Sequence, residues 1–212
     1  MIIPDNVTFI GDGAFEYCSV LTNVIIGDGV TTMGIYTFYN CVALTDIIIP
    51  DNVTSIGESA FQGCSALTSV SIGNGVTSLG PGAFSDCSAL TRVSIGNGVT
   101  SLGSGVFSNC SALISVNVGD GVTEIGGYTF YNCSSLSYVT IGKNVTSIGR
   151  EAFEKTSIAE CYCYATTPPE LVFYNYPYYA DSNAKLYVPT RCGAAYKSSN
   201  WGRWFKNIIE IE

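Results

Sequence analysis

Nine cysteines are the side chains of this sequence with the most direct chemical potential, because a thiol can form a disulfide, bind zinc or act as a nucleophile. If cysteines recur at equivalent positions of stacked repeats, their Cα atoms would lie close enough for a disulfide bridge. Equivalent inward positions nevertheless fit a small buried apolar residue better, and free cysteine is among the most buried residue types. We therefore expect free, structural thiols. Six of the cysteines recur every 23 residues: Cys18, Cys41, Cys64, Cys87, Cys110 and Cys133.

The lack of histidine narrows the chemistry further. A Ser-His-Asp or Cys-His nucleophile cannot be built, and transition metals lose their commonest ligand. The cysteine spacing is the repeat length rather than C-x-x-C, and Cys161 and Cys163 make only a single pair. Two carboxylates can cleave a glycoside, but nothing in the sequence marks out such a pair. We predict a protein that is not an enzyme and has no cofactor and no metal site.

The charge distribution argues against two classes of partner. The formal net charge is -8, and Arg92 is the only one of the nine Lys and Arg residues that precedes Lys143. Such an acidic surface cannot neutralise a run of phosphates, so we expect neither nucleic acid nor an anionic membrane surface as a partner. No apolar stretch approaches the roughly 20 residues of a membrane span, and residues 1–4 lack the pattern of a secretory signal. We expect no membrane span.

The cysteines belong to a repeat that must position every other side chain. Valine, leucine, glycine and threonine columns keep the same period of 23 residues. Equal intervals without insertion are the signature of a stacked solenoid, in which only stacking hides the apolar face of each short unit. A phenylalanine marks each repeat: Phe15, Phe38, Phe61, Phe84, Phe107, Phe130 and Phe153.

Each repeat combines an alternating apolar segment with a turn signal. Leu67, Val70 and Ile72 illustrate the pattern Leu-x-x-Val-x-Ile, which predicts a short strand that runs parallel to its equivalents in neighbouring coils. A triplet such as Gly73–Gly75 follows and turns the chain sharply. The threonine column that contains Thr77 predicts a second extended segment rather than a ligand-binding ladder. We interpret the glycine column as a requirement of backbone geometry.

The pattern I-G-x-x-A-F-x-x-C-x-x-L-x-x-V-x-I-(P/G)-x-x-V-T resembles the BspA-like, or treponemal-type, leucine-rich repeats of bacterial surface proteins. The match covers about residues 1–164. We predict an α/β repeat solenoid, a right-handed leucine-rich-repeat superhelix with a parallel sheet on one face and short helical or 3-10 turns opposite. Residues 1–164 are predicted to form about seven 23-residue repeats, and residues 165–212 a C-terminal cap.

The two ends of the array are expected to differ. In the last copy, Cys161 and Cys163 take the Val and Ile strand positions after a one-residue deletion. Within the cap, Arg191–Phe205 is predicted to contain a short helix and Asn207–Ile211 a strand, which together cover the apolar end. Met1 instead stands in mid-repeat, at the strand Val position. We expect that the native protein is longer or that this end packs against another molecule, a second copy of the chain included.

The exposed face of the predicted sheet is the candidate binding surface. Polar and aromatic residues gather toward its C-terminal half, whereas Ile25 and Ile48 lie near the N-terminal end. Arginine and tyrosine are among the residue types most enriched in interface hot spots. The alternative, which stays open, is a solvated face without a ligand. The predicted ligand-binding residues are Arg92, Asn117, Tyr138, Glu160 and Tyr162.

Two other surfaces carry clustered aromatic residues. Tyrosines of two Y-T-F-Y-N-C segments flank a core phenylalanine, and we expect them to cover the core. Aromatic residues of the cap can stack on sugars, but they also suit closure of an apolar end, which we favour. The first set is Tyr36, Tyr39, Tyr128 and Tyr131, and the second is Tyr174, Tyr176, Tyr178, Tyr179, Trp201 and Trp204.

The resemblance implies a function that composition and spacing do not show. It implies a non-enzymatic binding or adhesion module of a bacterial secreted or cell-surface protein, located outside the cell or on its surface. Its implied partner is a host matrix protein or another cell-surface protein, contacted through the exposed sheet face. Two alternatives stay open: a structural spacer or self-assembling scaffold, and carbohydrate binding through the cap aromatics.

Overall fold

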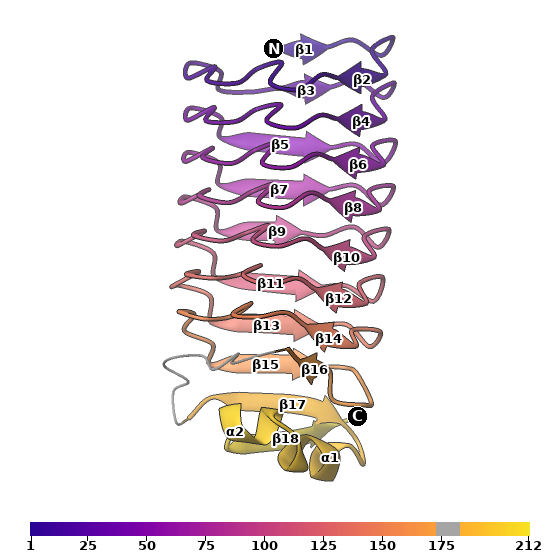
Figure 1. The fold of residues 1–212 in the computed structure, drawn as a ribbon, viewed down its shortest axis with the longest axis vertical. Coiled ribbons are helices and arrows are strands. Elements are labelled where there is room, and N and C mark those ends of the chain that lie inside the picture. The colour runs from indigo at the N-terminus through magenta and orange to yellow at the C-terminus, as the bar shows by residue number, and fades with distance from the viewer. Residues whose placement is uncertain (173–182) are drawn as a thin grey trace.

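The protein is a solenoid of stacked coils, which Figure 1 shows with the N-terminal coil at the top and the C-terminal elements at the bottom. The computed structural model describes residues 1–172 and 183–212. Within these residues, strands β1 (Ile2–Ile3) and β3 (Ile25–Ile26) form a parallel pair, and the other strands form two eight-stranded sheets in which all pairs are parallel. The prediction of a repeat solenoid with a parallel sheet is confirmed.

The first sheet, called here the long-strand sheet, is built from the Leu-x-x-Val-x-Ile segments and extended by two strands that follow the repeats. Its strands pair at the repeat interval, so Val70 of one coil lies beside Val93 of the next. Strand alternation buries Val70 and Ile72 and leaves Ser71 exposed. Its strands are β5 (Asp46–Ile49), β7 (Ser69–Ile72), β9 (Arg92–Ser94), β11 (Ser115–Val118), β13 (Tyr138–Ile141), β15 (Glu160–Cys163), β17 (Lys185–Pro189) and β18 (Asn207–Ile211).

The second sheet, the short-strand sheet, follows the turn triplets, and the threonine column lies immediately before its strands. The backbone N–H and the Oγ1 of Thr54 both donate to the carbonyl of Thr31 in the preceding coil, at 2.8 and 3.0 Å. The hydroxyls therefore reinforce the stack, in agreement with the structural interpretation of the column. Its strands are β2 (Phe9–Ile10), β4 (Thr32–Met33), β6 (Ser55–Ile56), β8 (Ser78–Leu79), β10 (Ser101–Leu102), β12 (Glu124–Ile125), β14 (Ser147–Ile148) and β16 (Glu170–Leu171).

The third side of each coil, the turn side, lies around the core phenylalanine, and here the prediction of short helical or 3-10 turns is wrong. Residues 1–172 contain consecutive turns on this side and no helical residue. The N–H of Phe61 donates to the carbonyl of Ala83 in the next coil, whereas that of Gln62 donates to Ser59 in its own turn. Helices keep these bonds within one segment. Positive φ angles at Ser59 (51°) and Gly63 (74°) accompany this alternation.

The core consists of columns of identical side chains. Neighbouring phenylalanine rings from Phe15 to Phe153 stack with centroids 4.9 to 5.7 Å apart and planes within 14° of each other. The rings from Phe38 to Phe130 are fully buried. Such aromatic pairs add about 0.5–1.5 kcal/mol beyond the burial of their surface. The same residue type at each step therefore stabilises every coil against the next.

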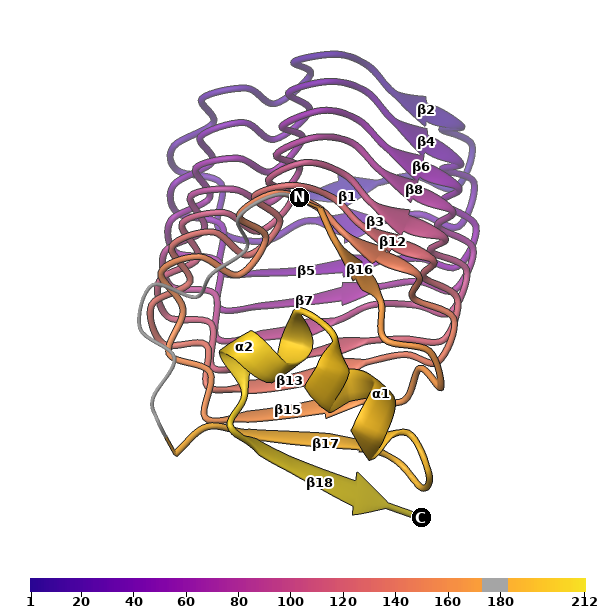
Figure 2. The ribbon, with the colours of Figure 1, turned by 60° about the horizontal axis from the view of Figure 1, so that its bottom comes forward.

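Elements after residue 164 continue the long-strand sheet and cover its end. Strand β17 pairs with β15, and β18 pairs with β17, both in parallel. Helices α1 (Gly193–Ser198) and α2 (Trp201–Trp204) lie across the end of the coils in Figure 2. The helix predicted within Arg191–Phe205 thus forms as two short helices, and the predicted strand at Asn207–Ile211 is β18. The domain boundary at residue 164 stays a prediction.

Buried aromatic residues connect these helices to the last coil. The hydroxyl of Tyr196 donates to the carbonyl of Ala165 at 2.7 Å, and the indole Nε1 of Trp201 donates to that of Pro169 at 2.9 Å. Tyr196 and Trp201 are both almost completely buried. Because each polar atom has a partner, the two large rings can close the apolar end without loss of hydrogen bonds.

The first coil is covered less than the others. Phe15 and Leu21 are half-buried, whereas their equivalents Phe38 and Leu44 in the next coil are fully buried. Ile2 in β1 is 71% exposed. The packing of this end against another molecule stays a prediction.

Candidate functional site

The outward face of the long-strand sheet presents two columns of side chains to the solvent. In its four-residue strands, the first and third residues are exposed or half-buried, whereas the second and fourth are buried. Since strands of a sheet lie about 4.8 Å apart, outward residues of equal phase form straight columns. One column is Asp46, Ser69, Arg92, Ser115, Tyr138, Glu160 and Lys185, and the other is Ile48, Ser71, Ser94, Asn117, Thr140, Tyr162 and Tyr187.

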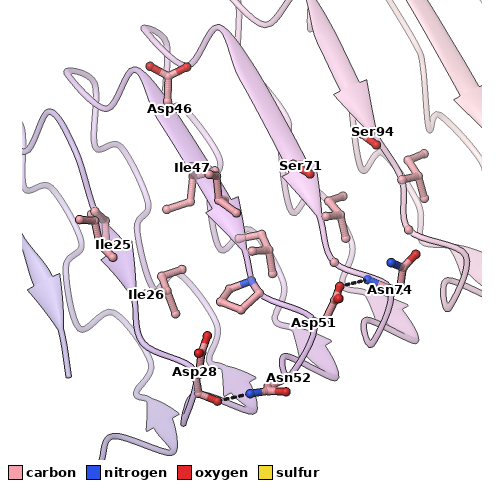
Figure 3. A pocket seen from close by; sticks show the side chains of 18 of the residues that line it. Ile25, Ile26, Asp28, Asp46, Ile47, Asp51, Asn52, Ser71, Asn74 and Ser94 are labelled. Atoms are coloured by element: carbon pink, nitrogen blue, oxygen red, sulfur yellow. Dashed lines mark hydrogen bonds between the residues drawn. The ribbon is translucent and has the colours of Figure 1, made fainter. Parts of the chain in front are cut away.

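The N-terminal part of this face contains a hollow of about 920 Å³, shown in Figure 3. Ile25 and Ile48 line it and are 56% and 71% exposed, so the surface offered there is apolar. Asp46, whose Oδ1 accepts a hydrogen bond from the Ser69 hydroxyl at 3.0 Å, adds a carboxylate to its lining. The hollow can therefore take an apolar group with a polar or cationic neighbour.

Some of the acidic and amide residues that line the hollow hold one turn on the next. Asp51 accepts the backbone N–H of Asn74 at 2.7 Å, and the side chain of Asn52 donates to the carbonyl of Asp28, as the dashed lines in Figure 3 show. These groups already have partners within the stack. Their role is structural, and the exposed isoleucines are the more available part of the hollow.

A second hollow, of about 600 Å³, continues along the face toward its middle. Ser71 and Ser94 are small and leave space between the taller residues Ile48, Arg92 and Asn117 around them. Arg92 and Asn117 are both exposed. Among the described residues, the guanidinium of Arg92 forms no salt bridge. Two of the predicted binding residues thus border one space.

The C-terminal part of the face carries a row of tyrosines. The ring of Tyr162 lies 5.2 Å from that of Tyr138 and 4.3 Å from that of Tyr187, between centroids. The hydroxyls of Tyr162 and Tyr187 donate to the carboxylate of Glu160 at 3.4 and 3.5 Å. Desolvation and the Glu160 charge raise the pKa of Tyr162 to about 12. The row offers a partner aromatic rings and hydroxyls beside one carboxylate.

The predicted site residues therefore fall into two groups rather than one. Arg92 pairs with Ser115, which pairs with Tyr138, so two strand spacings, roughly 10 Å, separate the arginine from the tyrosine row. Tyr187, on β17, was missed by the sequence analysis. The alternation of apolar and polar residues in Leu186-Tyr187-Val188 indicates a strand with Tyr187 on its outward face. This segment lies beyond the last repeat, so the repeat pattern did not include it.

The thiol column is embedded in the core of the stack. The Sγ of Cys64 donates to the carbonyl of Phe38 at 3.2 Å, and that of Cys87 to Phe61 at 3.3 Å. Burial raises the pKa of Cys64 to about 12. All nine cysteines are free. Because the thiolate is the reactive form, buried thiols of this kind are inert.

Thiol labelling is expected to divide the cysteines into two classes. In the native protein at pH 8, iodoacetamide should modify only the half-buried Cys18 and Cys192, and the other seven only after unfolding in guanidinium. Peptide mass spectrometry measures the modification at each site. Rapid native labelling of Cys64 or Cys87 would contradict the buried thiol column.

The cap aromatics divide according to where the structure places them. Trp201 and Trp204 are 1% and 8% exposed and contribute to closure of the apolar end. Their rings are therefore unavailable for stacking on a sugar. The other four aromatic residues of this set, Tyr174, Tyr176, Tyr178 and Tyr179, lie outside the described residues.

Comparisons with known proteins agree on the repeat type. A family model described as the BspA type leucine-rich repeat region matches residues 1–113 and 66–177, with six copies. A leucine-rich repeat protein of T. pallidum, TpLRR, is 28% identical with a TM-score of 0.69, over 73% of this chain and 75% of that chain. No match was found among curated proteins.

Two further solved structures share the fold at lower identity. A leucine-rich repeat protein from Bacteroides ovatus is 22% identical with a TM-score of 0.57, over 97% of this chain and 64% of that chain. A leucine-rich cell surface protein from Faecalibacterium prausnitzii is 24% identical with a TM-score of 0.50, over 100% and 78%. Neither of the helices found in the described part of the chain has the length and hydropathy to cross a membrane.

Proposed function

The chain belongs to the family of BspA-type leucine-rich repeats, and we propose that it is a non-enzymatic binding module that contacts a protein ligand through the outward face of the long-strand sheet. Stacked repeats create extended surfaces of the kind that solenoid proteins use for binding. The two hollows and the tyrosine row follow one another along this face. A ligand that spans them would contact all five predicted binding residues.

The observation that carries the proposal is the exposure of hot-spot residue types beside a hollow. Arg92 borders the middle hollow, and Tyr138, 42% exposed, begins the tyrosine row. Arginine and tyrosine supply much of the binding energy in protein interfaces because they combine large contact area with hydrogen bonding. Asn117, Glu160 and Tyr162 add polar partners, which suits a protein surface better than a small apolar ligand.

We place the protein outside the bacterial cell or on its surface. The resemblance to bacterial surface repeats supports this location, and the similar F. prausnitzii protein is a cell surface protein. A host matrix protein or another cell-surface protein is the partner that the family resemblance implies. The acidic charge of the chain favours a ligand with a basic contact region.

A binding screen with a double substitution tests this proposal. The purified chain is expected to bind one or more proteins on an array of host matrix proteins and polysaccharides, and Arg92→Ala/Tyr138→Ala should weaken that binding at least about 30-fold, since loss of a hot-spot residue costs about 2 kcal/mol or more. Surface plasmon resonance gives the affinity of each hit. Lys197→Ala, on helix α1, removes the same charge elsewhere and should leave the affinity unchanged.

Other outcomes would assign the function differently. A protein hit that survives the double substitution would remove the sheet face as the contact surface. A polysaccharide that still binds the double variant would indicate that the C-terminal elements form the contact surface. The lack of any hit, together with concentration-dependent association in sedimentation velocity, would favour the spacer or self-assembling scaffold.

A further inference from the structure

The sequence Y-T-F-Y-N-C occurs twice on the turn side, at Tyr36–Cys41 and at Tyr128–Cys133. The backbone setting is the same in both copies, since Thr37 and Thr129 each donate to the glycine carbonyl three residues earlier at 2.7 Å. In the first copy the two tyrosine rings meet edge to face at 5.3 Å and 80°, and in the second at 5.7 Å and 70°. The chain therefore builds the same aromatic pair twice.

In the second copy, cations from the next coil cover the tyrosine pair. The Nζ of Lys155 lies 4.7 Å from the ring centroid of Tyr131 and donates to its hydroxyl at 2.5 Å. The guanidinium carbon of Arg150 lies 5.9 Å from the ring centroid of Tyr128. A cation this close to an aromatic face is attracted by the ring quadrupole. This copy shows what kind of group the tyrosine pair binds.

In the first copy, the same repeat positions of the next coil hold no cation. Glu58 stands where the second copy has Arg150, and Gly63 stands where it has Lys155. Arg92 is the first Lys or Arg of the sequence, so none lies in the coils around this pair. Tyr36 is 40% exposed, so part of this tyrosine pair is accessible to a partner.

The preceding coil enlarges the first aromatic pair and adds negative charge. The ring of Tyr17 meets that of Tyr39 edge to face at 5.5 Å, and Tyr17 is 63% exposed. The second copy has Asn109 at the repeat position of Tyr17. Glu16, next to Tyr17, and Glu58 are both exposed. The first copy thus combines three ring surfaces with carboxylates on either side, without an internal cation.

We propose that Tyr17, Tyr36 and Tyr39, with Glu58, form a binding site for a lysine or arginine side chain in a basic segment of a partner protein. The incoming cation takes the place that Lys155 and Arg150 occupy over the second tyrosine pair. The rings attract it by the cation–π interaction, and the Glu58 carboxylate complements its charge. The site lies on the turn side and is independent of the binding surface proposed on the sheet face.

Isothermal titration calorimetry with an acetylated and amidated hexaarginine peptide tests this site. In physiological salt, which screens long-range attraction to the acidic chain, Tyr36→Leu/Tyr39→Leu should weaken binding about ten-fold, as expected for loss of a partly desolvated cation–π contact. The matched variant Tyr128→Leu/Tyr131→Leu should leave the affinity unchanged, because those rings already hold internal cations. Circular dichroism verifies that each variant is folded.

A pair of charge variants separates the site from non-specific attraction. Glu58→Arg places a cation at the repeat position of Arg150 and should abolish the binding, whereas Glu124→Arg, on β12, makes the same change of net charge elsewhere and should have little effect. Equal losses in the two charge variants, or equal losses in the two tyrosine variants, would overturn the proposal. So would a Tyr36→Leu/Tyr39→Leu protein that binds like the wild type.

Discussion

Replacing Phe84 by alanine is expected to lower the free energy of unfolding by about 3–5 kcal/mol, the loss typical of a large aromatic residue removed from a core. Phe84 is fully buried and stacks on both sides, with Phe61 at 4.9 Å and Phe107 at 5.6 Å between ring centroids. The substitution removes both contacts and leaves a cavity between two coils. Urea denaturation followed by circular dichroism measures the loss.

The matched control is the same substitution at the edge of the column. Phe15 is half-buried and stacks on one ring alone among the described contacts, that of Phe38 at 5.1 Å. Because solvent already reaches it, we expect Phe15→Ala to cost less than half as much as Phe84→Ala. In a solenoid, the central substitution should also weaken the coupling between the two halves and broaden the transition. Equal losses at both positions would show that ring stacking is not what holds the coils together.

Replacing Gly80 by alanine is expected to cost about 2–3 kcal/mol, although it adds only one methyl group. A Cβ on Gly80 would lie 2.5 Å from the backbone nitrogen of Glu58 and 2.5 Å from the carbonyl carbon of Gly57. These atoms belong to the preceding coil and cannot move without disturbing the stack. The cost must also exceed the gain of about 0.4–1 kcal/mol that alanine brings by restricting the unfolded chain.

The first coil again supplies the control. Gly11 stands at the same repeat position as Gly80, yet a Cβ there would meet only the ring of Phe9, at 3.8 Å. We expect Gly11→Ala to leave stability unchanged or to raise it by up to about 1 kcal/mol. Thermal and urea denaturation measure the free energy of unfolding of both variants. Similar losses of stability in the two would mean that the glycine column is needed for the local turn rather than for the close approach of the coils.

The sequence predicted the coils better than the conformation of one of their sides. Val70 and Ile72 pointed inward and Ser71 outward as strand alternation requires, and the register of the sheet equals the repeat length. The helical or 3-10 turns predicted opposite the sheet are absent from residues 1–172. A helix would use its own N–H groups, whereas Phe61 and its equivalents donate theirs to the next coil. The sequence alone did not show whether these backbone N–H groups bond within one segment or to the next coil.

The sequence placed the candidate residues on the outward sheet face but did not give their arrangement on it. Arg92 and Asn117 do border one hollow, and Glu160 and Tyr162 do lie together, yet the two groups are separate on the face. Tyr187 joins the tyrosine row through strand β17. The 23-residue period ends before that strand, so no count along the chain placed Tyr187 beside Tyr162. Pairing of β17 with β15 did so.

The sequence by itself determined the repeat length, the inward columns, the parallel register and the family. It could do so because a constant period makes each residue the neighbour of its own equivalent, so local spacing already states the stacking. Only the tertiary structure decided what lies over a given side chain from an adjacent coil. Lys155 covers Tyr131, whereas the equivalent place in the first copy falls to Gly63. The residue types at these two positions can be read from the sequence, but only the structure shows that the lysine side chain reaches back over the ring of the preceding coil.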